Sequence, residues 1–328
     1  MVRRTRSSLL LIVLCSIAMA AIAVPVGAQN WPSKPIRFVV PYQPGGIIDA
    51  AARIVAPKLT EAWGQQVIIE NKPGGNAFIG MHYVVKAAPD GYTFVLATLG
   101  DFTVNPSLFK DIPYSVEHDL TPVALMTGIP TLLAVNADTP YKSVADLIAD
   151  AKKQPGRISY STPGNGAINH IVMEAFALNT GTKFQHIPYK GGAPATTAVA
   201  AGDVPVGALA ITAAIPFIKS GKVKVLATAT PQRLESHPEW PSLAELGMLN
   251  FDGSNWVGMM APSKTPPDII ERMNSELGKI LLMPDVKERL AGTGGTPIPG
   301  SVANFQRRVK DETAAFRVIV EKANIQPQ

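Results

Sequence analysis

The sequence predicts an α/β fold with largely parallel strand pairing, and three observations point to it. Short runs of branched apolar residues alternate along the chain with segments that have the apolar spacing of helices. Only 17% of the residues are charged, below the usual quarter, so much of the chain must be buried. The 328 residues, less a short leader, lie near the size at which one core stops growing, so two lobes are expected.

The N-terminal segment has the features of a secretory signal peptide. Three arginines precede an apolar stretch over residues 9–24, which is followed by small residues up to Ala28. We expect cleavage after Ala28, so that residues 1–28 are removed and the mature protein lies in the periplasm. The single cysteine, Cys15, belongs to this leader, which excludes disulfides, thiolate catalysis and zinc–cysteine sites from the mature chain.

The charge balance excludes two classes of partner. Loss of the three leader arginines lowers the formal net charge from +5 to +2. A chain so close to neutrality gives no reason to expect nucleic acid or an anionic membrane surface as a partner. The apolar stretch of the leader is short for a membrane span, and no later stretch of the chain resembles one.

The N-terminal third alternates strands and helices in order. A branched run predicts the first strand, and the spacing of Ile47, Ala51, Val55 and Leu59 predicts the helix after it. Pro57 falls inside that helix, where we expect a kink rather than a division into two helices. The predicted strands are 36–41, 67–71 and 92–98, and the predicted helices are 47–63 and 77–88.

The rest of the chain continues the pattern and then becomes helical. Ser143 is placed to cap a helix, and the apolar runs around it have the length of buried strands. From Pro266 onward almost only helical spacing appears. The predicted strands are 132–136, 158–161, 184–188, 204–209 and 223–228, and the predicted helices are 143–153, one starting near Gly166, 193–201, 212–220, 267–282, 285–291 and 301–323.

Two glycine loops, each between a strand and a helix, are the candidate binding elements. The first lies in VPYQPGGIIDAAAR (residues 40–53) and the second in STPGNGAINH (residues 161–170). In open α/β sheets ligands gather beyond the carboxyl ends of strands, and the first turn of a helix offers unpaired amides that suit an anion. Ordinary turn chemistry explains either loop alone, whereas two of them favour a cleft that closes on one anion.

The loops do not match nucleotide motifs. Asn169 stands where the third glycine of a dinucleotide fingerprint belongs, and the next strand ends without the acid that grips a ribose. Ser220-Gly221-Lys222 lacks the upstream glycine and the following hydroxyl of a phosphate-binding loop.

No catalytic set is apparent, and no cofactor or metal is expected. A nucleophile elbow is absent. His170 and Glu174 are one helical turn apart but lack a third metal ligand, and the other histidines are scattered. Asp49 could serve as a general base, although a first-turn acid that interacts with the helix dipole is the preferred interpretation.

These motifs resemble the substrate receptors of tripartite tricarboxylate transporters, the periplasmic Bug proteins, over essentially the whole mature chain. The resemblance is carried by collinear motifs: WPSKPIRFVVPYQPGG (31–46), VIIENKPGGNAFIG (67–80), KAAPDGYTFVLAT (86–98), NPSLF (105–109), STPGNGAINH, IPYKGGAPA (187–195), IKSGKVKVLA (218–227) and SNWVGMMAP (254–262). It implies a two-lobed periplasmic-binding-protein fold, type II-like, with a ligand cleft between the lobes. The implied boundaries are 29–128 plus 255–328 for lobe I and 129–254 for lobe II.

The resemblance also implies which residues hold the ligand carboxylate. The residues that match the family's binding positions are Tyr42, Gly45, Gly46 and Asp49 in the first loop, Ser161, Asn165, Gly166, Ala167 and His170 in the second, and Tyr189, Lys190 and Gly191 as a third wall. Structural roles remain open as alternatives: packing for Tyr42, turn stabilisation for Ser161 and Asn165, a hydrogen-bonded core histidine for His170, and a solvated charge for Lys190.

Departures from the family pattern bear on the ligand. Asp101 and Phe102 replace a common Thr-His pair, Ala208-Leu209-Ala210 lacks an acid that many members carry, and Ala167 replaces a commonly hydroxylated residue. We expect the far end of the pocket to be less polar than in citrate receptors. An aromatic or branched monocarboxylate would fit it, as would a dicarboxylate with an apolar middle, and Asp101, if it faces the cleft, would repel a second carboxylate.

The expected function is capture of a small organic acid without chemistry. The protein, expected to be a monomer, would deliver the acid to the membrane permease of a tripartite tricarboxylate-type transporter or present it to a periplasmic sensor. The alternatives are a secreted enzyme acting on a small carboxylic acid through Asp49 and His170 across the cleft, and a purely structural surface protein.

Overall fold

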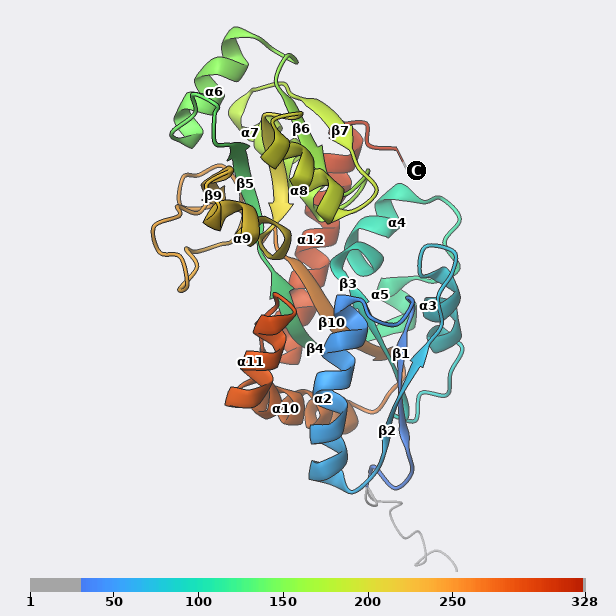
Figure 1. Ribbon diagram of the computed structural model, residues 1–328. Helices are drawn as coiled ribbons and strands as arrows, with labels where there is room; N and C mark the ends of the chain where they lie inside the picture. The colour runs from blue at the N-terminus through green and yellow to red at the C-terminus, as the bar shows by residue number, and fades with distance from the viewer. Residues whose placement is uncertain (1–30, 327–328) are drawn as a thin grey trace, which may run out of the picture. The chain divides into compact units, whose positions relative to one another are not determined.

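The strands form two separate sheets in the computed structural model, which describes residues 31–326 (Figure 1). The predicted signal peptide, residues 1–28, lies outside the described residues. The chain from Lys34 onward is one compact unit, and both sheets belong to it.

The first sheet has six strands in the order β11-β4-β10-β3-β1-β2. These strands are β1 (Ile36–Val40), β2 (Val67–Asn71), β3 (Thr93–Thr98), β4 (Leu120–Ile129), β10 (Asn255–Pro262) and β11 (Thr296–Pro297).

The second sheet has five strands in the order β7-β6-β8-β5-β9. They are β5 (Thr131–Asn136), β6 (Ser159–Thr162), β7 (Gln185–Pro188), β8 (Val206–Ala210) and β9 (Val223–Thr228). Only Pro130 separates β4 from β5, so the chain passes directly from one sheet to the other.

The expectation of largely parallel pairing is wrong for part of each sheet. β1 pairs in parallel with β2 and β3, and β6 with β7 and β8. β10 runs antiparallel to β3 and β4, and β5 runs antiparallel to β8 and β9. Both glycine loops follow strands that pair in parallel. Each loop therefore lies at the carboxyl edge of its sheet, where the loops between strands and helices gather.

The predicted strands 36–41, 67–71 and 92–98 and the helix after the first of them are present. α2 (Ile47–Trp63) is one continuous helix despite Pro57, and it ends at Gly64, a left-handed residue whose amide donates to Thr60. The other helices on this sheet are α3 (Phe78–Val85), the π-helix η1 (Gly100–Val104), α4 (Asn105–Leu108), α5 (Val116–Asp119), α10 (Pro267–Leu281), α11 (Pro284–Gly292) and α12 (Val302–Lys322).

The helices beside the second sheet also follow the predicted order. Ser143 caps the first of them, because its side chain accepts the amide of Asp146. They are α6 (Val144–Lys153), α7 (Ile168–Thr180), α8 (Gly192–Ala201) and α9 (Ile211–Lys219).

The sequence pattern misses the region between β3 and β5 and the strand β10. β4 and β10 are each paired on both sides and almost wholly buried, so they lack the alternation that marks a half-buried strand. Short elements such as η1, α4 and α5 span too few residues for a periodic signal.

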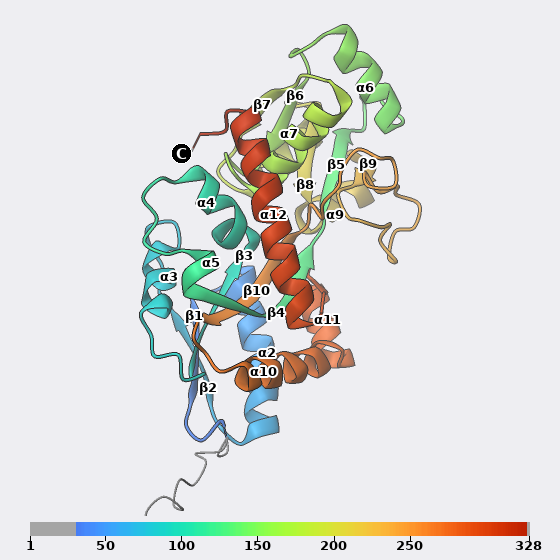
Figure 2. The ribbon, with the colours of Figure 1, turned by 180° about the vertical axis from the view of Figure 1, so that it is seen from behind.

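The C-terminal helix α12 connects the two sheets. It contacts η1, α4 and β4 on one side and α7 on the other, as both ribbon views show (Figures 1 and 2). Beneath it the buried Trp256 stacks on Phe102, with ring centroids 5.9 Å apart, and donates its indole N–H to Glu312 of α12 at 2.8 Å. No helix in the described part of the chain is long and apolar enough to cross a membrane.

Candidate functional site

The first glycine loop joins β1 to α2, and Tyr42 at its start is held by a buried acid. The Tyr42 hydroxyl donates to Asp101 Oδ1 at 2.6 Å, while 36% of the residue remains exposed. Asp101 Oδ2 accepts the amide and the hydroxyl of Thr98, both at 2.8 Å. Burial raises the pKa of Asp101, and these hydrogen bonds offset only part of that rise. The arrangement presents the tyrosine ring in a fixed orientation.

Asp49 holds the same loop together from the first turn of α2. Its Oδ2 accepts Arg53 Nε at 2.9 Å and the amide of Gly45 at 3.0 Å, and its Oδ1 accepts Asn71 Nδ2 at 3.1 Å. The hydrogen bond from Arg53 lowers the pKa of Asp49, aided by those from Gly45 and Asn71. Asp49 therefore lies in the first turn of the helix, as the preferred interpretation of the sequence has it, and its carboxylate accepts three hydrogen bonds.

The second glycine loop is held in a similar way by His170 in the first turn of α7. The amide of Gly166 donates to His170 Nδ1 at 3.2 Å, so this nitrogen carries no proton. The opposite ring nitrogen lies 3.7 Å from Glu174, which also accepts the Tyr160 hydroxyl at 2.6 Å. Burial would raise the pKa of Glu174, but His170 and Tyr160 outweigh it and lower the pKa.

A second histidine supports this loop from β7. His186 stacks on His170 with ring centroids 3.8 Å apart, and its Nε2 lies 2.6 Å from Thr162 Oγ1. The Thr162 hydroxyl in turn contacts the backbone of Gly164, so the two histidines hold both ends of the loop. Burial, together with the neighbouring His170, lowers the pKa of His186 to about 4.

The helix starts at the two loops differ from a capped helix elsewhere in the chain. In α6 the amide of Lys142 also bonds the acid four residues on, Asp146, but there Ser143 caps the helix with its side chain. At α2 and α7 the N-cap residues are Gly46 and Ala167, and neither makes a side-chain cap hydrogen bond. First-turn amides at both loops are therefore left for another acceptor, apart from that of His170, which donates to the carbonyl of Ala167 at 2.8 Å.

The remaining predicted residues of the second loop fall into two groups. The Ser161 hydroxyl is fully buried and donates to the carbonyl of Ala195 at 3.0 Å, so it is committed to the core. Asn165 is half-buried at the loop, and its side chain bonds no other described residue.

The predicted third wall lies against the second loop. The amide of Tyr189 donates to the carbonyl of Thr162 at 3.0 Å, and that of Gly191 to Pro163 at 2.9 Å. Gly191 has φ +114° and is the N-cap of α8, again without a side-chain cap. Lys190 is exposed and forms no ion pair with another described residue.

The two loops are connected through α4. The place where a Cβ of Gly166 would stand is in contact with the Leu108 side chain. Leu108 ends α4, which follows the π-helix that carries Asp101 and so anchors Tyr42. At Gly45 and Gly46, by contrast, a Cβ would meet nothing within 4 Å, so the first loop has open space before it.

Four residues at these loops were not predicted from the sequence. Asn71 bonds both Asp49 and the carbonyl of Tyr42, and Asn169 ties the first turn of α7 to the carbonyl of Ala208 at 3.1 Å. His186 was considered only as a scattered histidine. Ser107 in α4 has a buried hydroxyl with no partner among the described residues, which leaves it available to a ligand or water. Of these four residues, only Asn71 could have been found from the sequence, because it lies at the end of a predicted strand, where ligand-binding residues gather.

The site offers groups for binding rather than for chemistry. Backbone amides at the helix starts can donate to a carboxylate, whereas the Tyr42 hydroxyl already donates to Asp101 and His170 Nδ1 already accepts the Gly166 amide. Among residues 31–326 no group of three or more His, Cys, Asp or Glu residues is placed to hold a metal ion.

Comparisons with known proteins show which family and fold this chain resembles. The family model "Tripartite tricarboxylate transporter family receptor" matches residues 51–325. Protein BugT of Bordetella pertussis is 34% identical over 307 residues, which cover 93% of this chain and 94% of that protein.

Solved structures show the same fold. A TctC solute binding protein from Polaromonas, without ligand, has a TM-score of 0.81 and 28% identity, covering 89% of this chain and 99% of that one. Rpa4515 of R. palustris with adipate has a TM-score of 0.73 and 32% identity, covering 91% and 100%. The mixed α/β fold with two sheets is thus that of periplasmic binding proteins, as predicted.

Proposed function

Because this chain belongs to the tripartite tricarboxylate transporter receptor family, we propose that it binds a small organic carboxylate in the periplasm and delivers it to a membrane permease or a sensor. The supporting observation is the pair of uncapped helix starts at Gly46 and Ala167, each of which follows a parallel strand. At each start a side chain from the first turn of the helix accepts a backbone amide of the loop and so stabilises it.

We further propose the lobe boundaries expected from the sequence, 29–128 plus 255–328 and 129–254. The strands of the first sheet fall within the former, except that β4 ends one residue beyond it at Ile129, and those of the second fall within the latter. Two close glycine contacts join the lobes: Gly166 against Leu108, and Gly294 against Thr212. A ligand that touches both lobes would favour the arrangement in which these contacts are made.

The proposed ligand class is a carboxylate with an apolar middle. Both carboxylate oxygens of Asp101 accept hydrogen bonds, one from Tyr42 and the other from Thr98, so this acid orients the Tyr42 phenol at the loop. Ala167 and Ala208 add no polar side chain, and the relative Rpa4515 was solved with adipate, a dicarboxylate with an aliphatic middle. Calorimetric titration of adipate, benzoate and citrate tests this, and binding of citrate alone would rule the ligand class out.

A capping substitution tests the role of the helix start. Ala167→Asp would place a side-chain acceptor on the first-turn amides of α7, because Ala167 has the extended backbone of an N-cap, φ −61° and ψ 151°. We expect stability to rise by about 0.5–2 kcal/mol while the affinity for the bound acid falls at least about tenfold.

The matched control is Met283→Asp at the uncapped start of α11, where φ is −63° and ψ is 137°. It should raise stability without changing affinity. If Ala167→Asp is stabilised and binds as tightly as the wild type, the uncapped start of α7 is not the anion site.

The enzyme alternative is tested with the same ligand. Overnight incubation of the protein with the acid that it binds, followed by mass spectrometry, should return the acid unchanged. Conversion that depends on Asp49 or His170 would favour the enzyme instead.

A further inference from the structure

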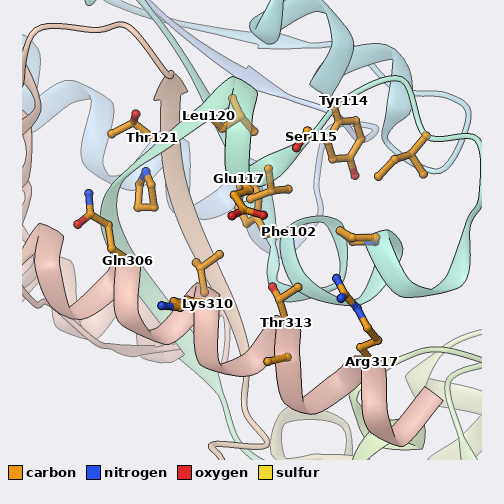
Figure 3. A pocket seen from close by; sticks show the side chains of 16 residues that line it. Phe102, Tyr114, Ser115, Glu117, Leu120, Thr121, Gln306, Lys310, Thr313 and Arg317 are labelled. Carbon is orange, nitrogen blue, oxygen red and sulfur yellow. The ribbon is translucent and has the colours of Figure 1, made fainter. Parts of the chain in front are cut away.

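A groove of about 740 Å³ lies between α12 and the segment that runs from η1 to the start of β4 (Figure 3). None of the residues predicted for the carboxylate site lines it. Its volume falls within the range of small-molecule sites, about 300–1,000 Å³.

The floor of this groove is apolar. Pro106, Ile112 and Pro122 contribute half-buried side chains to it, and the buried Phe102 and Leu120 lie among them. An aliphatic or aryl body laid on these side chains would remove apolar surface from water on both partners.

The rims of the groove carry charge. Lys310 and Arg317 are exposed on α12, seven residues and so about 10 Å apart along one face of the helix. Neither forms an ion pair with another described residue. Figure 3 shows Arg317 directed into the groove from α12 and Glu117 facing it from the opposite side.

From this arrangement we propose that the groove is a second ligand site, for an amphipathic monoanion. Its single carboxylate binds Arg317, and its apolar body lies on Pro106, Ile112 and Pro122. Glu117 on the opposite rim repels a second acidic group, so the groove prefers a monocarboxylate to a dicarboxylate.

The groove shares a wall with the first glycine loop. Phe102 and Asp101 are consecutive in the π-helix η1, and the Tyr114 hydroxyl donates to the carbonyl of Asp101 at 2.8 Å. A ligand in the groove therefore contacts the element that anchors Tyr42.

Octanoate, an aliphatic monocarboxylate, is the probe for this site. Isothermal titration of the full mature chain should detect octanoate binding, and Arg317→Glu should weaken it at least about tenfold by reversing the charge that holds the carboxylate. Ala314→Trp, at an exposed lining position on α12, should block the groove and abolish binding.

The matched control is Arg307→Glu. Arg307 is exposed on the same helix but does not line the groove, so this variant should bind octanoate as the wild type does.

Three results would overturn the proposal. The first is octanoate binding that is unchanged in both Arg317→Glu and Ala314→Trp. The second is no octanoate binding by the wild type at about 5 mM, beyond the millimolar range of weak specific ligands. The third is loss of octanoate binding in Ala167→Asp, which would place octanoate at the carboxylate site. Circular dichroism and thermal melts of each variant show whether it is folded, and because the groove and the uncapped start of α7 are tested with different variants, either proposal can fail alone.

Discussion

The rings of His170 and His186 stack with their centroids 3.8 Å apart and an interplanar angle of 20°. His170 accepts the amide of Gly166, and His186 contacts Thr162 at the other end of the same loop. The stacked pair therefore joins the two ends of the loop, and burial together with the neighbouring His170 lowers the pKa of His186.

The first prediction concerns His186 and acid. Because its pKa is about 4 in the folded protein against 6.5 in the unfolded chain, the unfolded chain takes up a proton first as pH falls. The stability that it contributes is complete above pH 6.5 and is lost between 6.5 and 4, by up to about 3 kcal/mol.

Urea denaturation at several pH values checks this. His186→Phe keeps an aromatic ring beside His170 but cannot take up a proton, so the stability difference between wild type and variant should shrink as pH falls from 6.5 to 4. His118→Phe, at an exposed position, is the control and should leave the pH profile unchanged. A constant difference between wild type and His186→Phe would contradict the prediction.

Glu312 should give a pH dependence of the opposite sign. Burial raises its pKa to about 7 despite its hydrogen bonds from Arg308 and Trp256, so the folded protein holds a proton that the unfolded chain, with a pKa of 4.5, has released. Its contribution is complete below pH 4.5 and falls as pH rises to 7, by up to about 3 kcal/mol.

Glu312→Gln removes this titration and keeps an acceptor for the Trp256 indole. Stability measured by urea denaturation should then rise relative to the wild type as pH increases from 4.5 to 7. Since His186 acts in the opposite sense over nearly the same window, the wild-type profile itself should be flatter than that of either variant. Parallel profiles for the wild type and Glu312→Gln would refute the assignment.

Gly166→Ala should be far more costly than an alanine at another left-handed glycine. Gly166 has φ +71°, and its Cβ would collide with Leu108. Gly181 has φ +64° with nothing within 4 Å, so Gly181→Ala incurs only the left-handed backbone cost of about 1–2 kcal/mol. Chemical denaturation should show the larger loss for Gly166→Ala, and Gly166→Ala combined with Leu108→Ala should recover part of it. Equal losses of stability in the two glycine variants would mean that the contact with Leu108 does not add to the cost of Gly166→Ala.

Asp49→Asn should destabilise the first loop more than Asp146→Asn destabilises the start of α6. Both acids accept the amide four residues earlier, but Asp49 is buried and also accepts Arg53 and Asn71, whereas Asp146 is exposed. Removing the charge leaves these donors with a weaker partner, and we expect a loss of about 1–3 kcal/mol for Asp49→Asn and a smaller loss for the exposed control. Thermal melts at pH 7 measure both, and a greater loss in Asp146→Asn would contradict the assigned role.

The local rules of the chain account for much of the fold. Apolar spacing predicted α2 over 47–63, and the hydroxyl of Ser143 was correctly placed as a cap, because both depend on neighbours within one helical turn. The glycines of the two loops were recognised for the same reason.

Tertiary structure decided what surrounds those loops. The pairing of Gly166 with Leu108, of His170 with His186 and of Tyr42 with Asp101 joins residues 16 to 59 positions apart, and no periodicity encodes such contacts. Likewise β4 and β10 meet across more than a hundred residues and are buried on both faces, so only their partners in the sheet define them. Sequence by itself determined the longer helices, the glycine turns and the family. The packing of distant segments determined which amides stay open, because burial and hydrogen bonding between those segments fix each side chain.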